Sequence, residues 1–120
     1  RNQLVTSAVL KLSDGNPEES SELIREIVRW RLENQPGGQN AGSVFTNPKD
    51  KSAGRLIEDS GCKGMRVGSA EVSTKHANFI QADAGGKAED IKDLMQLISD
   101  SVYSKFGIRL TAETEMIGFD

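Results

Sequence analysis

The residues best suited to chemistry lie together in residues 40–48 (NAGSVFTNP). A hydroxyl at Ser43 and an amide at Asn47 could hydrogen-bond to a ligand, and Ala41 and Gly42 are small enough to let it come close. Residues 35–43 show no helical or strand period, so we interpret them as a loop, and loops carry function more often than other segments. The residues alone leave a simpler interpretation open, in which Ser43 and Asn47 merely satisfy turns.

Composition limits the classes of function. The 120 residues fit one compact domain, and a net charge of −3 without a stripe of Lys and Arg makes nucleic acid a poor partner. Apolar runs are too short to span a membrane and residues 1–15 lack the apolar core of a secretory signal, so we expect a soluble protein of the cytoplasm. Cys62, the one cysteine, can form neither an internal disulfide nor a multi-thiolate metal site, and we expect no metal.

The N-terminal elements predict a strand followed by a helix. Residues 4–12 are rich in strand formers, and the immediate start without a methionine suggests a piece of a longer protein. Asn16 as cap, Pro17 at the first helical position and Glu19 at the third form a capping-box pattern, which predicts a helix to about Asn34. Its apolar residues share one side, as expected of a helix that covers a core: Leu23, Ile24, Ile27, Val28 and Leu32.

The rest of the chain predicts an α+β domain. A short helix at residues 55–60 ends at Gly61, and two strands follow at residues 65–72 and 76–80. Apolar residues then recur every three or four positions from 88 to 106, the clearest helix in the chain, with Met95 as core filler. A final strand covers residues 108–117. We expect a small mixed sheet packed with two main helices and one short helix.

Four segments together resemble the MurB family of reductases. Residues 40–48 are similar to the family's serine-bearing signature, and residues 72–80 look like its Val-Ser-x-Lys-His-Ala-Asn-Phe block. The closing residues 110–118 resemble its terminal strand, usually Leu-x-Pro-Glu-Val-x-x-Ile-Gly, which aligns the glutamate with Glu113. Further matches support the resemblance, which covers nearly the whole chain: residues 53–58, Gly61, Gly64, Arg31 and Gln35-Pro36.

The resemblance implies an oxidoreductase of peptidoglycan synthesis. Family members reduce UDP-N-acetylglucosamine enolpyruvate to UDP-N-acetylmuramate: NADPH reduces FAD, the flavin delivers hydride to the enolpyruvyl double bond, and an acid protonates the adjacent carbon. FAD is held mainly by an N-terminal domain that this chain lacks. Residues 1–36 would then be the end of the flavin-domain region and a linking helix, and residues 37–120 the substrate-binding domain. We expect the isolated chain to be inactive; the alternative is a stand-alone interaction domain without catalysis.

The same resemblance implies the catalytic residues. Ser43 is carried over as the proton donor, since a hydroxyl stays protonated while it waits and can still donate to a strongly basic carbon held beside it. Glu113 is carried over as the second catalytic residue, which helps polarise the substrate carboxylate or orient the donor. Glu115, two residues on and on the same face of the expected strand, stays open as the alternative acid.

Four residues are candidates for substrate binding. Asn47 matches a family position near the nucleotide, and Lys75, His76 and Asn78 offer polar groups suited to phosphate or uracil. His76 could instead be structural and Lys75 could face solvent. The sequence departs from the family at two neighbouring positions: Thr46 stands where many members carry lysine, and Ala112 replaces the usual proline before the glutamate.

Overall fold

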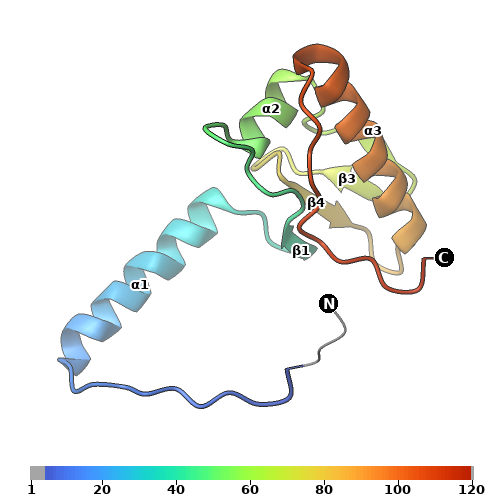
Figure 1. Ribbon diagram of the computed structural model, residues 1–120. Helices are drawn as coiled ribbons and strands as arrows, with labels where there is room; N and C mark the ends of the chain where they lie inside the picture. The colour runs from blue at the N-terminus through green and yellow to red at the C-terminus, as the bar shows by residue number, and fades with distance from the viewer. Residues whose placement is uncertain (1–4, 120) are drawn as a thin grey trace. The chain divides into compact units, whose positions relative to one another are not determined.

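The computed structural model describes residues 5–119, which divide after Arg31 into two compact units (Figure 1). The first unit contains an extended segment and most of helix α1 (Pro17–Asn34). The second contains a four-stranded sheet, helices α2 and α3, and the closing segment of the chain. Within residues 5–119, no helix is long and apolar enough to cross a membrane.

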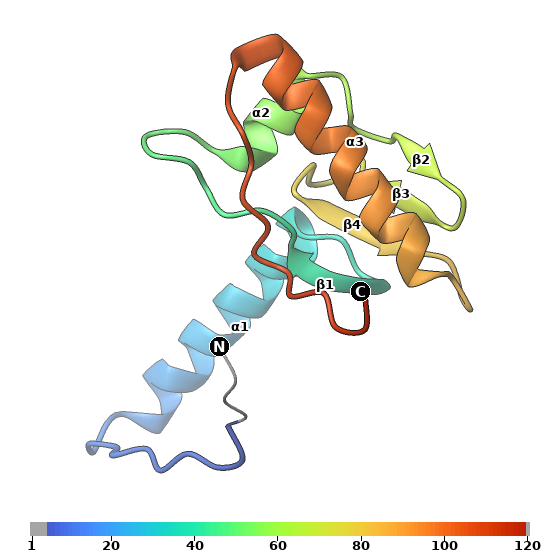
Figure 2. The same cartoon turned by 45° about the vertical axis from the view of Figure 1, so that its right-hand side comes forward.

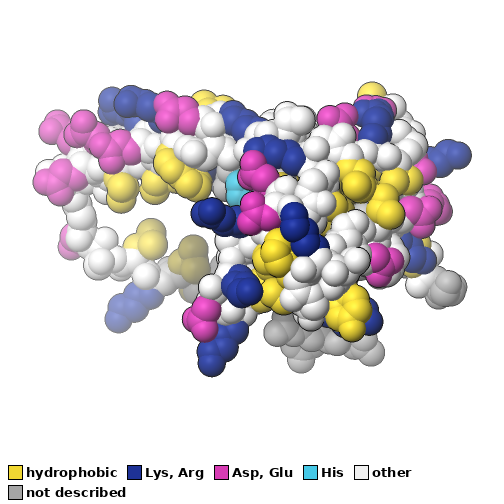
Figure 3. Space-filling view, turned by 90° about the horizontal axis from the view of Figure 1, so that it is seen from above, with side chains coloured by type: hydrophobic (Ala, Val, Ile, Leu, Met, Phe, Trp, Pro, Cys, Tyr) yellow, Lys and Arg dark blue, Asp and Glu magenta, His cyan; other side chains and the backbone are white. Residues whose placement is uncertain are grey.

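Helix α1 begins and ends where the sequence predicts. Asn16 Oδ1 accepts hydrogen bonds from Glu18 N at 2.9 Å and Glu19 N at 3.4 Å, and Asn16 Nδ2 donates to Glu19 Oε1 at 3.2 Å. The expectation that α1 covers a core is wrong for the described chain, because none of its residues is buried. In Figure 3 hydrophobic side chains form an apolar row along one edge of α1. The large apolar residues of the helix are 49–71% exposed: Leu23, Ile24, Ile27, Val28, Trp30 and Leu32.

The strand predicted at residues 4–12 is also wrong as far as the structure describes it. Residues 5–12 carry no regular structure, and Val5, Val9, Leu10 and Leu12 are 79–99% exposed. A strand needs a neighbour to pair with its backbone, and the described residues offer none to this segment. The start of the prediction, residue 4, lies outside the described residues.

The sheet of the second unit has the order β1-β4-β3-β2. Its strands are β1 (Gln39–Ser43), β2 (Arg66–Val67), β3 (Ala70–Val72) and β4 (Phe79–Ala82). The α+β class is confirmed, but all three pairings run antiparallel, so the sheet described is not the mixed one expected. Residues 39–43, interpreted as loop, form strand β1, and the single strand expected at 65–72 is the β2–β3 hairpin.

Two helices complete the second unit, and Figure 2 shows α3 lying along the sheet with α2 beside its C-terminal half. Helix α3 spans Ala88–Phe106 as predicted, and Gly107 ends it in the left-handed conformation with φ of 67°. Helix α2 spans Ala53–Asp59, and the Ser52 side chain caps it by accepting from Arg55 N at 3.3 Å. The expected short helix is therefore confirmed, two residues earlier than its predicted start.

One hydrophobic core lies between α3, α2 and the sheet. It contains the buried residues of α3, the inward residues of the strands and two residues directly after β1. Its most deeply buried large side chains are Ile57, Leu94, Ile98, Val72 and Val102, each less than 2% exposed. Cys62 is buried in the same core as a free thiol.

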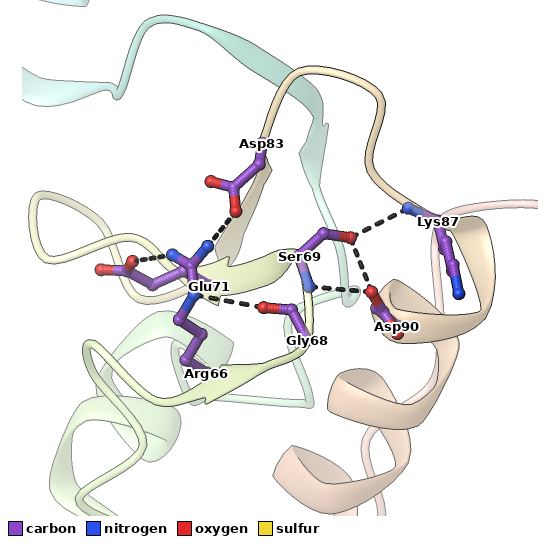
Figure 4. Close-up of polar contacts among 7 residues, drawn as sticks. All are labelled: Arg66, Gly68, Ser69, Glu71, Asp83, Lys87 and Asp90. Atoms are coloured by element: carbon purple, nitrogen blue, oxygen red, sulfur yellow. Dashed lines mark hydrogen bonds and ion pairs between the residues drawn. The ribbon is translucent and has the colours of Figure 1, made fainter.

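The β2 edge of the sheet is held by a polar cluster (Figure 4). Asp90 Oδ2 accepts from Ser69 N at 2.8 Å and from Ser69 Oγ at 2.6 Å, while Ser69 Oγ accepts from Lys87 N at 2.9 Å. Ser69 thus ties the hairpin turn to the N-terminus of α3. Beside it, Arg66 pairs with Glu71 at 2.7 Å and also with Asp83.

Candidate active site

Ser43 is the last residue of β1 and lies at a β-bulge. The pairs Asn40↔Gln81 and Ser43↔Phe79 place three steps on β1 against two on β4. Gly42 takes up the extra residue at φ of 82°, and Asn40 Oδ1 accepts from Gly42 N at 3.0 Å. Bulges re-aim side chains and are common beside active sites. Ser43 is half-buried, and its hydroxyl finds no hydrogen-bond partner within residues 5–119.

The closing segment brings Glu113 next to this bulge. Glu113 N donates to Val44 O at 2.8 Å, Thr46 N donates to Thr111 O at 2.9 Å, and Phe45 pairs with Ala112 in an antiparallel bridge. The final strand expected at 108–117 is therefore reduced to this short pairing. The backbone of the closing segment nevertheless places Glu113 directly beside the residue that follows Ser43. Glu113 and Ser43 lie 70 positions apart in the sequence.

Glu115 is held differently. No backbone hydrogen bond joins it to β1 or the residues after it among those described, and it lines a cavity of about 240 Å³ together with Ile91, Met95 and Met116. Both carboxylates are on exposed residues. The backbone pairing therefore distinguishes the two candidates: Glu113 is the one fixed next to Ser43.

Asn47 organises the loop between β1 and α2. Its Oδ1 accepts from Ala53 N, the first residue of α2, at 2.9 Å. Thr46 donates from Oγ1 to Thr111 O at 3.3 Å. Asn47 is exposed, so its amide nitrogen remains open to a ligand while its oxygen stabilises the start of α2.

The hydrogen-bonding groups of Asn78 are used within the protein itself. The residue is only 4% exposed, its Nδ2 donates to Phe45 O at 2.8 Å, and its Oδ1 accepts from Phe45 N at 3.0 Å. Its own carbonyl accepts from Val44 N at 2.9 Å, and its own N–H donates to His76 Nδ1 at 3.2 Å. An amide whose two ends both bind backbone has little left for a substrate.

Lys75 and His76 lie at a cavity of about 420 Å³ on the side of α2, and Ser43, Glu113 and Asn78 do not line it. In Figure 3 the imidazole is surrounded by side chains of both charges. Arg55 faces Asp59 at 3.8 Å, and Glu58 accepts from Lys63 at 2.9 Å, which lowers the pKa of Glu58. The Lys75 ammonium donates to Leu32 O, and the His76 ring packs edge-on against Phe79 at 4.8 Å.

The six candidate residues therefore fall into two groups. Ser43, Glu113 and Asn78 meet around Val44 and Phe45, whereas Lys75 and His76 face the α2 cavity and Asn47 holds the loop between the groups. No sequence signal indicates the Asn40 bond that shapes the bulge, since asparagine there resembles any turn residue. Among residues 5–119, no group of three or more His, Cys, Asp or Glu side chains could hold a metal ion.

Comparison with known proteins gives a consistent result. Residues 33–117 match the family model of the UDP-N-acetylenolpyruvoylglucosamine reductase C-terminal domain. The UDP-N-acetylenolpyruvoylglucosamine reductase of Synechococcus sp. (strain CC9605) is 43% identical over 98% of this chain and 40% of the relative. That of Thiobacillus denitrificans is 45% identical over 90% of this chain and 34% of the relative.

A solved structure agrees with the sequence relatives. The UDP-N-acetylenolpyruvylglucosamine reductase (MurB) of Thermus caldophilus superposes with a TM-score of 0.73 and 37% sequence identity, over 88% of this chain and 37% of that chain. The chain thus spans 34–40% of the length of the curated relatives it is compared with. Its match lies in their C-terminal domain.

Proposed function

Since this chain belongs to the UDP-N-acetylenolpyruvoylglucosamine reductase family and matches its C-terminal domain, we propose that it is the substrate-binding, proton-donating part of such a reductase. The substrate would be UDP-N-acetylglucosamine enolpyruvate and the product UDP-N-acetylmuramate, a precursor of peptidoglycan. The observation that carries the proposal is that the Ser43 hydroxyl, which has no partner within residues 5–119, and the Glu113 backbone meet around Val44.

Saturating the enolpyruvyl double bond requires one hydride and one proton on adjacent carbons. A bound FAD, reduced by NADPH, supplies the hydride. In this proposal the Ser43 hydroxyl gives its proton to the neighbouring carbon, which carries the basic electron pair, and recovers a proton from solvent afterwards. General acids of this kind accelerate reactions by about 10²–10⁴-fold.

The residues present fit a partner group that comes from outside this chain. Ser43 is half-exposed at the edge of the sheet, its hydroxyl has no acceptor within residues 5–119, and Gly42 beside it presents no side chain. A donor kept free of internal hydrogen bonds can point its proton at a substrate. We therefore propose that the flavin is held chiefly by the missing part of the reductase, and that this chain contributes the donor.

Glu113 is proposed to act beside Ser43. Its backbone is fixed to Val44, so its carboxylate is available within the same small region to orient the donor or to hydrogen-bond the substrate. The family resemblance of residues 110–118 and this pairing both favour Glu113 over Glu115. Comparing Glu113→Gln with Glu115→Gln in the complete reductase tests the choice: only the first is expected to slow substrate reduction, and the reverse result would assign the acid to Glu115.

Nucleotide binding is proposed for the α2 side of the domain. Lys75 and His76 line its 420 Å³ cavity, and cavities of this size accommodate small-molecule groups. Arg55 adds a third nitrogen-bearing side chain there, although the carboxylates of Glu58 and Asp59 offset part of the positive charge. Asn47, with its amide nitrogen open, is proposed to contact the nucleotide from the loop.

The first unit is proposed to join the domain to the rest of the reductase. The apolar row of α1 and the apolar residues of the extended segment are exposed, and the relatives contain more than half of their length beyond the matched region. Residues 1–36 would then belong with the flavin-domain region and residues 37–120 with the substrate domain. The isolated chain is expected to show no NADPH-dependent turnover, because it lacks the flavin side of the cleft.

The decisive experiment separates the two half-reactions in the complete reductase. In stopped-flow measurements, Ser43→Ala should leave NADPH-dependent flavin reduction unchanged while flavin reoxidation by the enolpyruvyl substrate slows by on the order of 100-fold or more, because only proton delivery is lost. Normal reoxidation in a folded Ser43→Ala enzyme would remove Ser43 from the mechanism.

A further inference from the structure

The polar residue most deeply placed around the candidate site is Asn78, and its side chain makes a closed pair with one residue of the neighbouring segment. Nδ2 donates to Phe45 O at 2.8 Å and Oδ1 accepts from Phe45 N at 3.0 Å. This reproduces with a side chain the two hydrogen bonds that a paired strand residue would make. Asn78 therefore extends β1 beyond its last residue, where the backbone of β4 has already turned away.

The same pair controls the position of both candidate catalytic residues. Val44, between Ser43 and Phe45, donates to Asn78 O at 2.9 Å on one side and accepts from Glu113 N at 2.8 Å on the other. Ser43 lies one residue before this clamped stretch, and Glu113 is joined to the stretch by its backbone hydrogen bond to Val44 O. A change in the Val44–Phe45 backbone would thus move the hydroxyl and the carboxylate together.

We propose that Asn78 is a positioning residue: it does not contact the substrate, and it holds the Ser43 donor and Glu113 in place by clamping Val44 and Phe45. This rests on the proposed roles of Ser43 and Glu113. It also replaces the expectation that Asn78 binds the substrate nucleotide, because the residue is 4% exposed and both ends of its amide are used.

The residues that hold Asn78 in place also favour a positioning role. His76 Nδ1 accepts from Asn78 N at 3.2 Å, which fixes the turn that presents the amide. Gly54 of α2 leaves the room for this turn, since a side-chain carbon there would approach His76 Cε1 to 3.2 Å and Asn78 Cβ to 3.6 Å. Asn78 thus lies next to Gly54 of α2, is braced by His76, and bonds to Phe45 through both ends of its amide.

The test is a double-mutant cycle in the complete reductase. Asn78→Ala should reduce the rate of flavin reoxidation by substrate on the order of 100-fold, the cost of misplacing a reacting group by about 1 Å, while NADPH-dependent flavin reduction and the substrate KM stay near wild type. In a Ser43→Ala background the same change should cost little more, because the donor it positions is already gone. Ser69→Ala, at the opposite edge of the sheet, is the matched control and should leave the rate unchanged.

Three outcomes would overturn the proposal: a folded Asn78→Ala enzyme with wild-type reoxidation, a loss seen mainly in KM, or losses that multiply fully with Ser43→Ala. Normal reoxidation in Ser43→Ala alone would instead refute the proposed function, so the two failures are distinguishable. If Asn78→Ala does not fold, Asn78→Asp keeps the size and the acceptor for Phe45 N but loses the donor. Hydrogen exchange should then show faster exchange at the amides of Val44 and Glu113, whose backbone bonds lie beside the lost contact, and unchanged exchange there would equally refute the clamp.

Discussion

The two edges of the sheet treat their polar groups in opposite ways. At the β2 edge, Ser69 bonds to both Asp90 and Lys87, and Arg66 pairs with two carboxylates. At the β1 edge, the Ser43 hydroxyl has no partner among the described residues, although the backbone around it is clamped by Asn78 and Glu113. The comparison teaches that a serine with every bond satisfied holds structure, while one with a fixed backbone and a free hydroxyl is available for chemistry.

The largest expected effect is on the substrate-reduction rate, when Ser43 and Ser69 are each replaced by alanine in separate variants. Ser43→Ala should lower the substrate-reduction rate of the complete reductase by about 10²–10⁴-fold. It should barely change the melting temperature, because the hydroxyl makes no hydrogen bond to the described residues. Ser69→Ala should show the reverse pattern. A Ser43→Ala enzyme that is destabilised as much as Ser69→Ala would abolish the contrast between the edges.

A core substitution sets the scale for stability. Leu94 is fully buried in α3, and Leu94→Ala should lower the free energy of unfolding by about 2–5 kcal/mol because it leaves a cavity. Leu97, on the same helix and 43% exposed, is the matched control and should cost less than about 1 kcal/mol as alanine. Denaturant titrations of both variants measure the difference. Equal losses would show that the core between the edges is not packed as described.

The Ser69 variant measures the strength of the β2 edge. Removing its hydroxyl deletes one hydrogen bond to Asp90 and one from Lys87 N, so Ser69→Ala should cost about 1–2 kcal/mol of unfolding free energy. Chemical denaturation followed by circular dichroism is sufficient. A neutral result would mean that water replaces the hydroxyl without loss and that this edge is held by Arg66 instead.

Acid should weaken the β2 edge through Asp90. The Ser69 hydroxyl and then the Ser69 backbone N–H, by hydrogen-bonding to the carboxylate, lower the pKa of Asp90 in the folded state. A lowered folded-state pKa stabilises the fold fully above the ordinary carboxyl pKa, and this contribution is lost as pH falls through the lowered value. Asp90→Asn should therefore flatten the acid limb of the stability curve. An unchanged acid limb would contradict the assignment.

The sequence predicted the elements whose signals are local. Asn16 and Pro17 marked the start of α1, and Gly107 marked the end of α3, because caps and glycine at a positive φ are decided within a few residues. Strand β1 was missed because Gly, Ala and Ser have low strand propensity. Its residues are strand only through pairing with β4, about 40 positions away.

The candidate site residues come from the family resemblance, which says nothing of their geometry. The family resemblance pointed to Ser43 and Glu113, but no sequence pattern indicates that Glu113 N meets Val44 O, because that contact depends on where the closing segment crosses β1. The substrate-binding expectation for Asn78 failed to anticipate its burial for a similar reason. A polar residue is expected to be exposed unless its hydrogen-bond partner is known, and for Asn78 that partner is the backbone of Phe45.

The exposed apolar row of α1 bears on the order of protein synthesis. The matched domain is C-terminal in the family, so the remaining part of such a reductase leaves the ribosome before α1 does. Domains fold as units during translation, and in the arrangement proposed above an already formed N-terminal surface would receive Leu23, Ile27 and Val28 as soon as they emerge. In the isolated chain, the same helix would expose an apolar surface of the kind that chaperones and proteases bind.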